Sequence, residues 1–194
     1  ICTHRHPETF EHAMGADTFK KLMDRFEVVT FRLKHSLVFD LMCQPFAPVD
    51  RKVWDEVQND LYEKTGEVIN TLVSEAGPES QISVQALRRL LPLHPTTAML
   101  LAHLSQEFSS AQRTLFSFLT RTQEKGDGPF IQFLKNNEIG AFVTPDALFD
   151  YFAEEMSEHE EMFRDALGWL KQNEKDLDGA EKAVLKTALL LIIL

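Results

Sequence analysis

Two arginines stand where a guanidinium could reach a phosphate group. Arg25 follows Asp24 at the end of an expected helix, and Arg113 opens an expected helix of core-type residues. A guanidinium stays charged and can donate two hydrogen bonds to phosphate oxygens at once, which suits contact with a γ-phosphate. The alternative is a surface arginine paired with a carboxylate, Asp24 or Glu27 for Arg25 and Glu107 for Arg113. Composition alone favours that alternative for both arginines.

Histidines form the second group of candidate residues. Thr3-His4-Arg5-His6 follows an expected strand end, where a polar side chain could sense a phosphate or orient a water molecule. His94 precedes Pro95 at an expected helix start, where a neutral imidazole could contact a base or a ribose. The alternative for His94 is a ring that only satisfies backbone groups near the helix cap.

A metal site in a helical bundle would require His4, His6 and His12 to converge. His-X-His pairs are common by accident, and no second pair of Cys or His residues lies close in sequence. We therefore expect no metal site.

Motif and charge statistics exclude several function classes. The sequence contains no Gly-X-X-X-X-Gly-Lys-Ser/Thr loop, no Gly-X-Ser-X-Gly and no Gly-X-Gly-X-X-Gly, so we expect no catalytic apparatus within this chain. The net charge of -10 repels a phosphate backbone, which argues against direct nucleic-acid binding. Two cysteines make no disulfide framework, which is typical of a reducing compartment and predicts a cytoplasmic location. No apolar stretch approaches the roughly 20 residues of a membrane span, so we expect no membrane association.

The hydrophobic pattern predicts a mainly α chain. The strand that we expect is Phe26 to Leu33, which is rich in Phe and Val. Asp50 and Ser83 are expected to cap helices, and Pro95 and Pro145 stand in first turns. Further expected helices cover residues 96–108, 111–122, 130–136, 147–155, 158–173 and 180–194.

The opening residues Ile1-Cys2-Thr3-His4 have no Met, no basic segment and no apolar leader, so we do not expect them to be a signal peptide. They are typical of the inside of a strand, and we expect the protein to extend upstream.

Several segments, in this order, resemble large bacterial P-loop ATPases of the AAA+ or STAND type, many of them encoded in anti-phage defence loci. The segments are Thr3-His4, residues 24–31, Leu93-His94-Pro95-Thr96 and residues 112–119. The strongest piece is the His-Pro pair followed by Gln-Arg-Thr-Leu-Phe-Ser-Phe-Leu. Asp-Arg-Phe looks like the arginine-finger turn of AAA+ motors such as the Holliday-junction branch-migration ATPase. Residues 148–152 and the last helix look like the continuation of that group into a winged-helix region.

The resemblance implies a role for each matched residue. Thr3 or His4 would be the first nucleotide sensor, and Arg25 would be a finger that reaches the γ-phosphate of a neighbouring subunit. Arg113 would be the second sensor, in contact with the γ-phosphate of its own subunit, and His94 would lie near the adenine. ATP and Mg²⁺ would be bound mainly by a phosphate-binding loop upstream of residue 1.

The resulting prediction is a mainly α fold with three parts. Residues 1–35 would be the edge of an α/β P-loop core, residues 36–140 a helical lid, and residues 141–194 the start of a winged-helix-like region. The expected function is to sense nucleotide and transmit its state within a homo-oligomeric parent ATP hydrolase, in phage defence. The alternative is a helical protein-interaction module without nucleotide binding. The two differ in whether a phosphate-binding loop lies upstream.

Overall fold

Helices make up most of the structure, a computed structural model that describes residues 15–25, 35–44, 48–80, 82–107, 111–122, 126–159, 161–173 and 175–193. In chain order the elements are α2 (Ala16–Met23), α3 (His35–Cys43), α4 (Arg51–Ala76), η2 (Pro78–Ser80), α5 (Val84–Arg89), α6 (Pro95–Glu107), α7 (Ala111–Leu119), β1 (Arg121–Thr122), β2 (Gly126–Asp127), α8 (Pro129–Asn136), α9 (Pro145–His159), α10 (Glu161–Asn173) and α11 (Gly179–Ile193). The prediction of a mainly α fold is confirmed. The expected strand Phe26–Leu33 lies outside the described residues.

Local sequence signals set the helix starts. The Asp50 carboxylate accepts hydrogen bonds from the backbone N–H groups of Lys52 (2.9 Å) and Val53 (3.2 Å), which confirms the predicted cap of α4. The Ser83 hydroxyl accepts from the Ala86 N–H at 3.1 Å in the same way. These caps satisfy N–H groups that have no partner within their own helix.

The helix predicted over residues 111–122 is wrong at its end. α7 stops at Leu119, and Arg121–Thr122 instead pair with Gly126–Asp127 as a short antiparallel hairpin. The Gly128 N–H then donates to the Thr120 carbonyl at 2.9 Å. A Cβ at Gly128 would lie 2.1 Å from the Ser117 carbonyl oxygen, so only glycine allows the chain to return this closely to the end of α7.

The helix predicted over residues 158–173 also begins too early, because α9 continues to His159 and α10 starts at Glu161.

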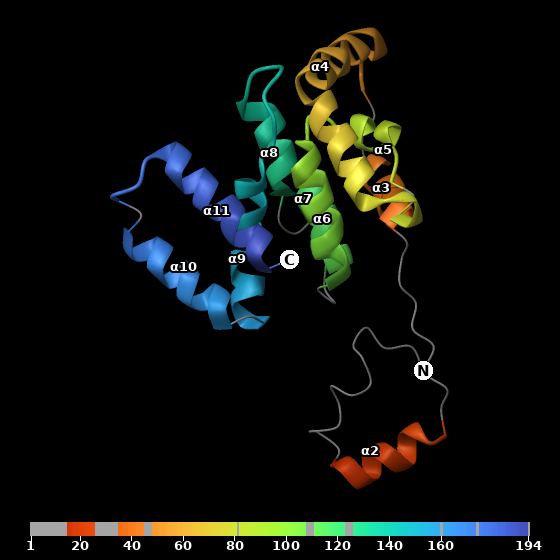
Figure 1. Cartoon of the computed structure of the whole chain (residues 1–194), viewed down its shortest axis with the longest axis vertical. Coiled ribbons are helices and arrows are strands. Elements are labelled where there is room, and N and C mark those ends of the chain that lie inside the picture. The colour runs from red at the N-terminus through yellow and green to blue at the C-terminus, as the bar shows by residue number, and fades with distance from the viewer. Residues whose placement is uncertain are drawn as a thin grey trace.

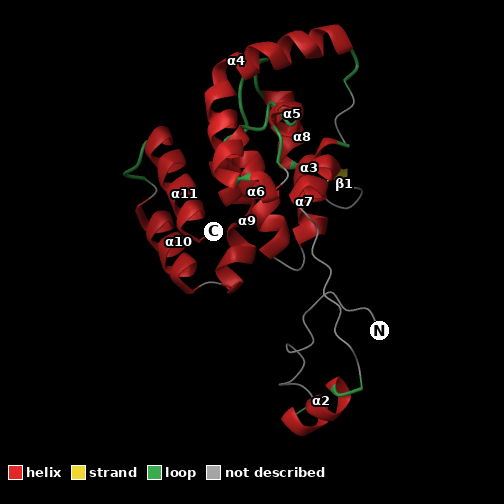
Figure 2. Cartoon of the chain, turned by 45° about the vertical axis from the view of Figure 1, so that its right-hand side comes forward, coloured by secondary structure: helices red, strands yellow, loops and turns green. Residues whose placement is uncertain are grey.

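The helices from α3 through α9 share one core of large apolar side chains. Its largest fully buried members include Phe39, Met42, Phe118, Phe149 and Phe152. α10 and α11 fold back along α9, as Figure 1 shows, and they bury Leu170 and Leu190, respectively. α2 lies apart from this body in both Figure 1 and Figure 2. Within the described part of the chain, no helix combines the length and the apolar character needed to cross a membrane.

Candidate functional site

One wall of the candidate site is the first half of α4. The Asp50 cap starts this helix at Arg51, and the start places Trp54, Val57 and Leu61 on one face, because positions three and four apart lie above one another. Leu61 is fully buried, Trp54 and Val57 are half-buried, and Val53 beside them is 49% exposed. The same helix face therefore passes from the core to the surface.

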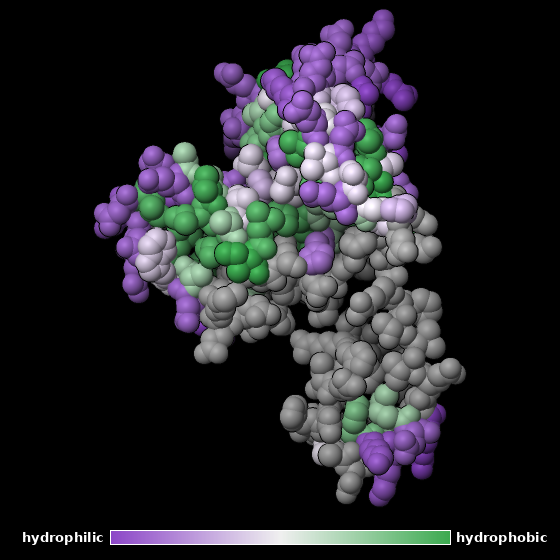
Figure 3. All heavy atoms as spheres, in the orientation of Figure 1, coloured by the Kyte–Doolittle hydropathy of each residue, from purple (hydrophilic) through white to green (hydrophobic). Residues whose placement is uncertain are grey.

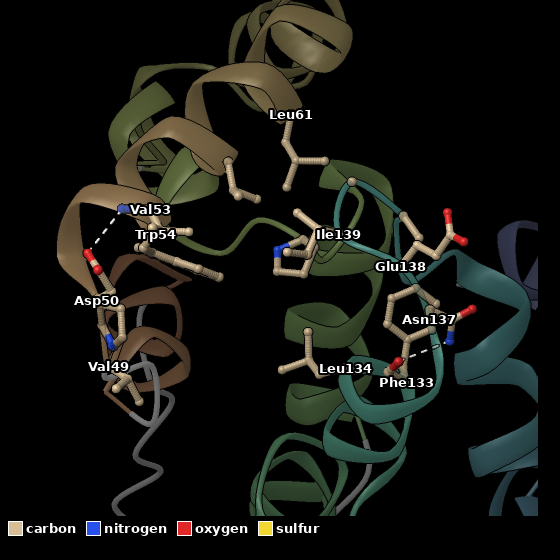
Figure 4. Close-up of a pocket in the computed structure, with 15 residues that line it drawn as sticks. Val49, Asp50, Val53, Trp54, Leu61, Phe133, Leu134, Asn137, Glu138 and Ile139 are labelled. Atoms are coloured by element: carbon tan, nitrogen blue, oxygen red, sulfur yellow. Dashed lines mark hydrogen bonds between the residues drawn. The ribbon is translucent and has the colours of Figure 1, made fainter.

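The opposite wall is α8 with the segment 137–141 that follows it. Asn137 closes α8, because its backbone N–H and its side-chain Nδ2 both donate to the Phe133 carbonyl at 3.0 Å. The chain then leaves the helix, and Ile139 is 80% exposed. Figure 4 shows Ile139 and Leu134 pointing from this wall toward Trp54 on the other.

Hydrogen bonds hold the end of this second wall against the start of α6. Leu93 and Val143 form a parallel backbone bridge. The Val143 N–H donates to the Pro92 carbonyl, and the His94 N–H donates to the Val143 carbonyl, both at 3.0 Å. The buried Thr97 hydroxyl donates to the same Val143 carbonyl at 2.9 Å. We name this set, Pro92–Thr97 with Val143, the 92–143 joint.

The 92–143 joint has two consequences. It ties the start of α6 to the residues just before α9, across the boundary predicted between residues 140 and 141. It also anchors the chain four residues after Ile139.

Between the two walls lies a hollow of about 400 Å³, which we name the α4–α8 groove. Val49 is fully exposed at its edge, and Leu134 is 42% exposed. Single exposed aliphatic side chains are normal on a protein surface, but several that converge on one hollow make it a candidate binding surface. The charged side chains in its lining are Asp50 and Glu138.

The polar groups of the groove do not form a reaction centre. Asp50 and Asn137 already bond to backbone groups of their own helix ends. Glu138 is exposed and has no His, Cys or Ser beside it in the lining. No group of three or more His, Cys, Asp or Glu residues in the described ranges could hold a metal, and His4, His6 and His12 lie outside those ranges.

Arg25 and His94 are the predicted site residues whose side chains the structure places. Arg25 is exposed directly after α2, and α2 lies apart from α6, whose start carries His94 (Figures 1 and 2). The structure therefore does not bring these two residues together. Arg113 lies in the first turn of α7 with its side chain outside the described part, and Thr3 and His4 are outside it altogether. The nucleotide roles of all five remain predictions.

His94 stands at the cap of α6. Its Nδ1 accepts a hydrogen bond from the Thr96 N–H at 3.3 Å, and its ring meets Phe142 edge-on with 5.8 Å between centroids. Burial lowers the pKa of the His94 imidazole below its ordinary value of 6.5, because desolvation disfavours the charged form. The ring is therefore neutral at pH 7 with its proton on Nε2, as its acceptor role at Nδ1 requires. This geometry matches the capping role, which was the alternative for this residue.

Sequence reasoning missed the groove residues. One signal was available, because Ile139 interrupts the polar run Asn136-Asn137-Glu138 directly before Gly140. Its opposite wall comes from α4, far away in the sequence, so no local pattern could pair the two.

Comparison with known proteins adds no relatives. No protein-family model, no curated protein and no solved structure matches the chain.

Proposed function

We propose that the chain is a protein-interaction module that receives the apolar face of a partner segment in the α4–α8 groove. The convergence of Val53, Leu134 and Ile139, all exposed, on one hollow carries this proposal. Each Å² of apolar surface that a partner removes from water there contributes about 25 cal/mol. The groove has few polar groups left to orient a small substrate, which favours a partner that binds through apolar contact.

The walls favour an α-helical partner. The backbone groups of α4 and α8 are used in their own helices, so these two helices offer no strand edge for main-chain pairing. Asp50 to Leu61 covers about 16 Å of helix axis, which accommodates about three turns of a partner helix. A partner with apolar residues at positions i, i+3, i+4 and i+7 would present a matching stripe.

The groove exists before any partner binds. The 92–143 joint anchors the chain just after the segment that carries Ile139, and the Asp50 cap fixes the start of the opposite wall. A wall that is already ordered loses little conformational entropy on binding, which favours affinity. The nucleotide-sensing role predicted from the sequence is independent of this proposal and remains a prediction.

The test uses Trp54 as its reporter. Trp54 and Trp169 are the two tryptophans of the chain, so a Trp169→Phe background leaves Trp54 alone in the groove. The probe is an uncharged amphipathic peptide of about 14 residues, which form about four helical turns. It has leucines at positions i, i+3, i+4 and i+7 and glutamines at the other positions. We expect the peptide to shift Trp54 emission to shorter wavelength in a saturable manner.

Matched substitutions locate the binding. Ile139→Asn should weaken peptide affinity by about tenfold or more, equivalent to about 1.4 kcal/mol. Val184→Asn changes a comparably exposed aliphatic residue on α11 (68% exposed) and should leave affinity unchanged. Equal loss in both variants, or no loss in either, would overturn the proposal.

A further inference from the structure

The charges around the α4–α8 groove are arranged at its margins. Asp50 and Glu138, the charged residues of its lining, are both exposed carboxylates. They come from opposite walls, and in Figure 4 they lie at the two outer sides of the apolar hollow, with Ile139 between them. A partner helix in the groove would thus pass one carboxylate on each side.

A second set of carboxylates follows the outer side of α4. Glu56 and Asp60 lie three and seven positions after Val53, so helix geometry places them next to it on the solvent side of the wall. Both are exposed. Figure 3 shows hydrophilic atoms of α4 bordering hydrophobic atoms beside the top of α8. Glu56 and Asp60 therefore place two carboxylates beside the α4 side of the apolar strip.

Two of the nearby cations, Lys135 and Arg88, are engaged by other groups. Lys135 forms an ion pair with Asp127. The Arg88 guanidinium lies 4.8 Å from the Tyr62 ring centroid and donates to the Asn59 side chain. Arg51 and Lys52, in the first turn of α4, are two and one positions before Val53 and so do not share its face. Lys52 lies four positions before Glu56 and therefore beside it on the outer side of the helix.

Lys64 is the cation at one end of the groove. Its Nζ lies 3.8 Å from where a Cβ on Gly140 would stand. Because Lys64 is at one end and the carboxylates are along the sides, the two ends of the groove differ in charge. The C-terminus of a helix is the negative end of its dipole, so we expect the C-terminus of the partner helix to point toward Lys64.

We infer that the partner of the α4–α8 groove is a basic amphipathic helix, with aliphatic residues on one face and Lys or Arg beside them. This inference rests on the proposed function, because it names the class of partner for the same groove. The net charge of -10 adds a general attraction for such a helix. The carboxylates beside the groove would determine at which position along the groove the helix binds.

The test compares peptides that differ only in charge. The leucine–glutamine peptide is joined by two versions with the same leucines, one with lysine and one with glutamate at the positions beside the leucine face. We expect the lysine peptide to bind most tightly and the glutamate peptide least, by Trp54 emission in the Trp169→Phe background. Raising salt from about 0.05 M to about 0.5 M should reduce this difference, because it shortens the Debye length.

Charge variants separate local from general attraction. Asp50→Asn with Glu138→Gln keeps the α4 cap, since Asn also caps well, and removes both margin charges. We expect about three- to tenfold weaker binding of the lysine peptide and a clearly smaller loss for the uncharged glutamine peptide. The control, Asp165→Asn with Asp176→Asn, removes two exposed charges near α10 and should have less effect.

The outcomes distinguish the two proposals. If the three peptides bind equally and Ile139→Asn weakens all of them, the groove binds helices but the basic partner is wrong. If the two charge variants weaken the lysine peptide equally, the attraction is general and the inference also fails. If no peptide is sensitive to Ile139→Asn, the groove itself is not the binding site.

Discussion

The segment 137–144 borders two regions of opposite character. At Val143, which is 1% exposed, the backbone is bonded on both sides and the side chain belongs to the core. Four residues earlier, Ile139 is 80% exposed and faces the α4–α8 groove. The same short stretch of chain is therefore buried and hydrogen-bonded at Val143 and exposed to solvent at Ile139.

This difference separates stability from binding. Apolar atoms that are already buried in the 92–143 joint contribute to folding, whereas apolar atoms left in water at the groove contribute only when a partner covers them. The joint also borders the groove, because Val143 anchors the chain four residues after Ile139. Changes in the joint should thus alter both properties, and changes in the groove should alter binding alone.

The largest effect is expected for Val143→Ala. Removing two buried methyl groups should lower the free energy of unfolding by about 2–3 kcal/mol, through lost transfer energy and a residual cavity. Urea denaturation measures the change. Ile139→Ala is the matched control and should change stability by less than about 0.5 kcal/mol, since its side chain is already in water. Similar losses in the two variants would contradict the division between joint and groove.

A smaller loss is expected for Thr97→Val. This change keeps the shape of the buried side chain and removes the hydroxyl that donates to the Val143 carbonyl. That carbonyl retains the His94 N–H, so the cost should be about 1 kcal/mol. Thr97→Ser keeps the hydroxyl as a control for the bond itself. A Val variant as stable as wild type would show that the hydrogen bond adds nothing to the joint.

His94 should make the joint sensitive to acid. Its pKa in the folded chain is below the ordinary 6.5 because of burial, so below pH 6.5 the unfolded chain binds more protons at this residue. The stabilisation is complete above pH 6.5 and is lost as the pH falls through the folded-state pKa. Protonation of Nδ1 also removes the cap to the Thr96 N–H, a bond worth about 1 kcal/mol or less.

The measurement for His94 is urea denaturation at about pH 7.5 and about pH 5. His94→Asn retains a capping side chain that does not titrate, and it should lose less stability over this range than the wild type. Parallel losses in both proteins would exclude His94 as a source of the acid sensitivity.

The smallest stability change is expected for Ile139→Asn. The side chain is mostly in water in the free protein, so unfolding should change by less than about 0.5 kcal/mol. The same variant is expected to lose peptide binding, which makes it the sharpest separation of the two regions. A clear loss of stability in urea would show that Ile139 supports the fold and would weaken the assignment of the groove.

Local signals predicted much of the helical structure. The caps at Asp50 and Ser83 and the helix starts at Pro95 and Pro145 were read correctly, because each depends on residues within one turn. The end of α7 was predicted wrongly, because the β1–β2 hairpin competes with the helix at Arg121 and Thr122. The helical periodicity of residues 111–122 alone does not reveal that residues 121–122 pair with a later segment.

The candidate site followed a different rule. The sequence singled out His94, and the structure places it at a helix cap, a role that its position before Pro95 had already suggested as the alternative. The sequence did not single out Ile139, Leu134 or Val53 as binding residues. Each is an ordinary apolar residue by type, and only its exposure to solvent distinguishes it. That exposure depends on how the rest of the chain packs around it.

By itself, the sequence determined a mainly α chain, the positions of several helix starts and a strong excess of negative charge. These properties depend on composition and on contacts within a few residues. Only the tertiary structure decided that α4 and α8 form two walls of one groove. The physical reason is the 92–143 joint, which links Thr97 to Val143 across 46 positions of the chain and so fixes one wall against the body that carries the other.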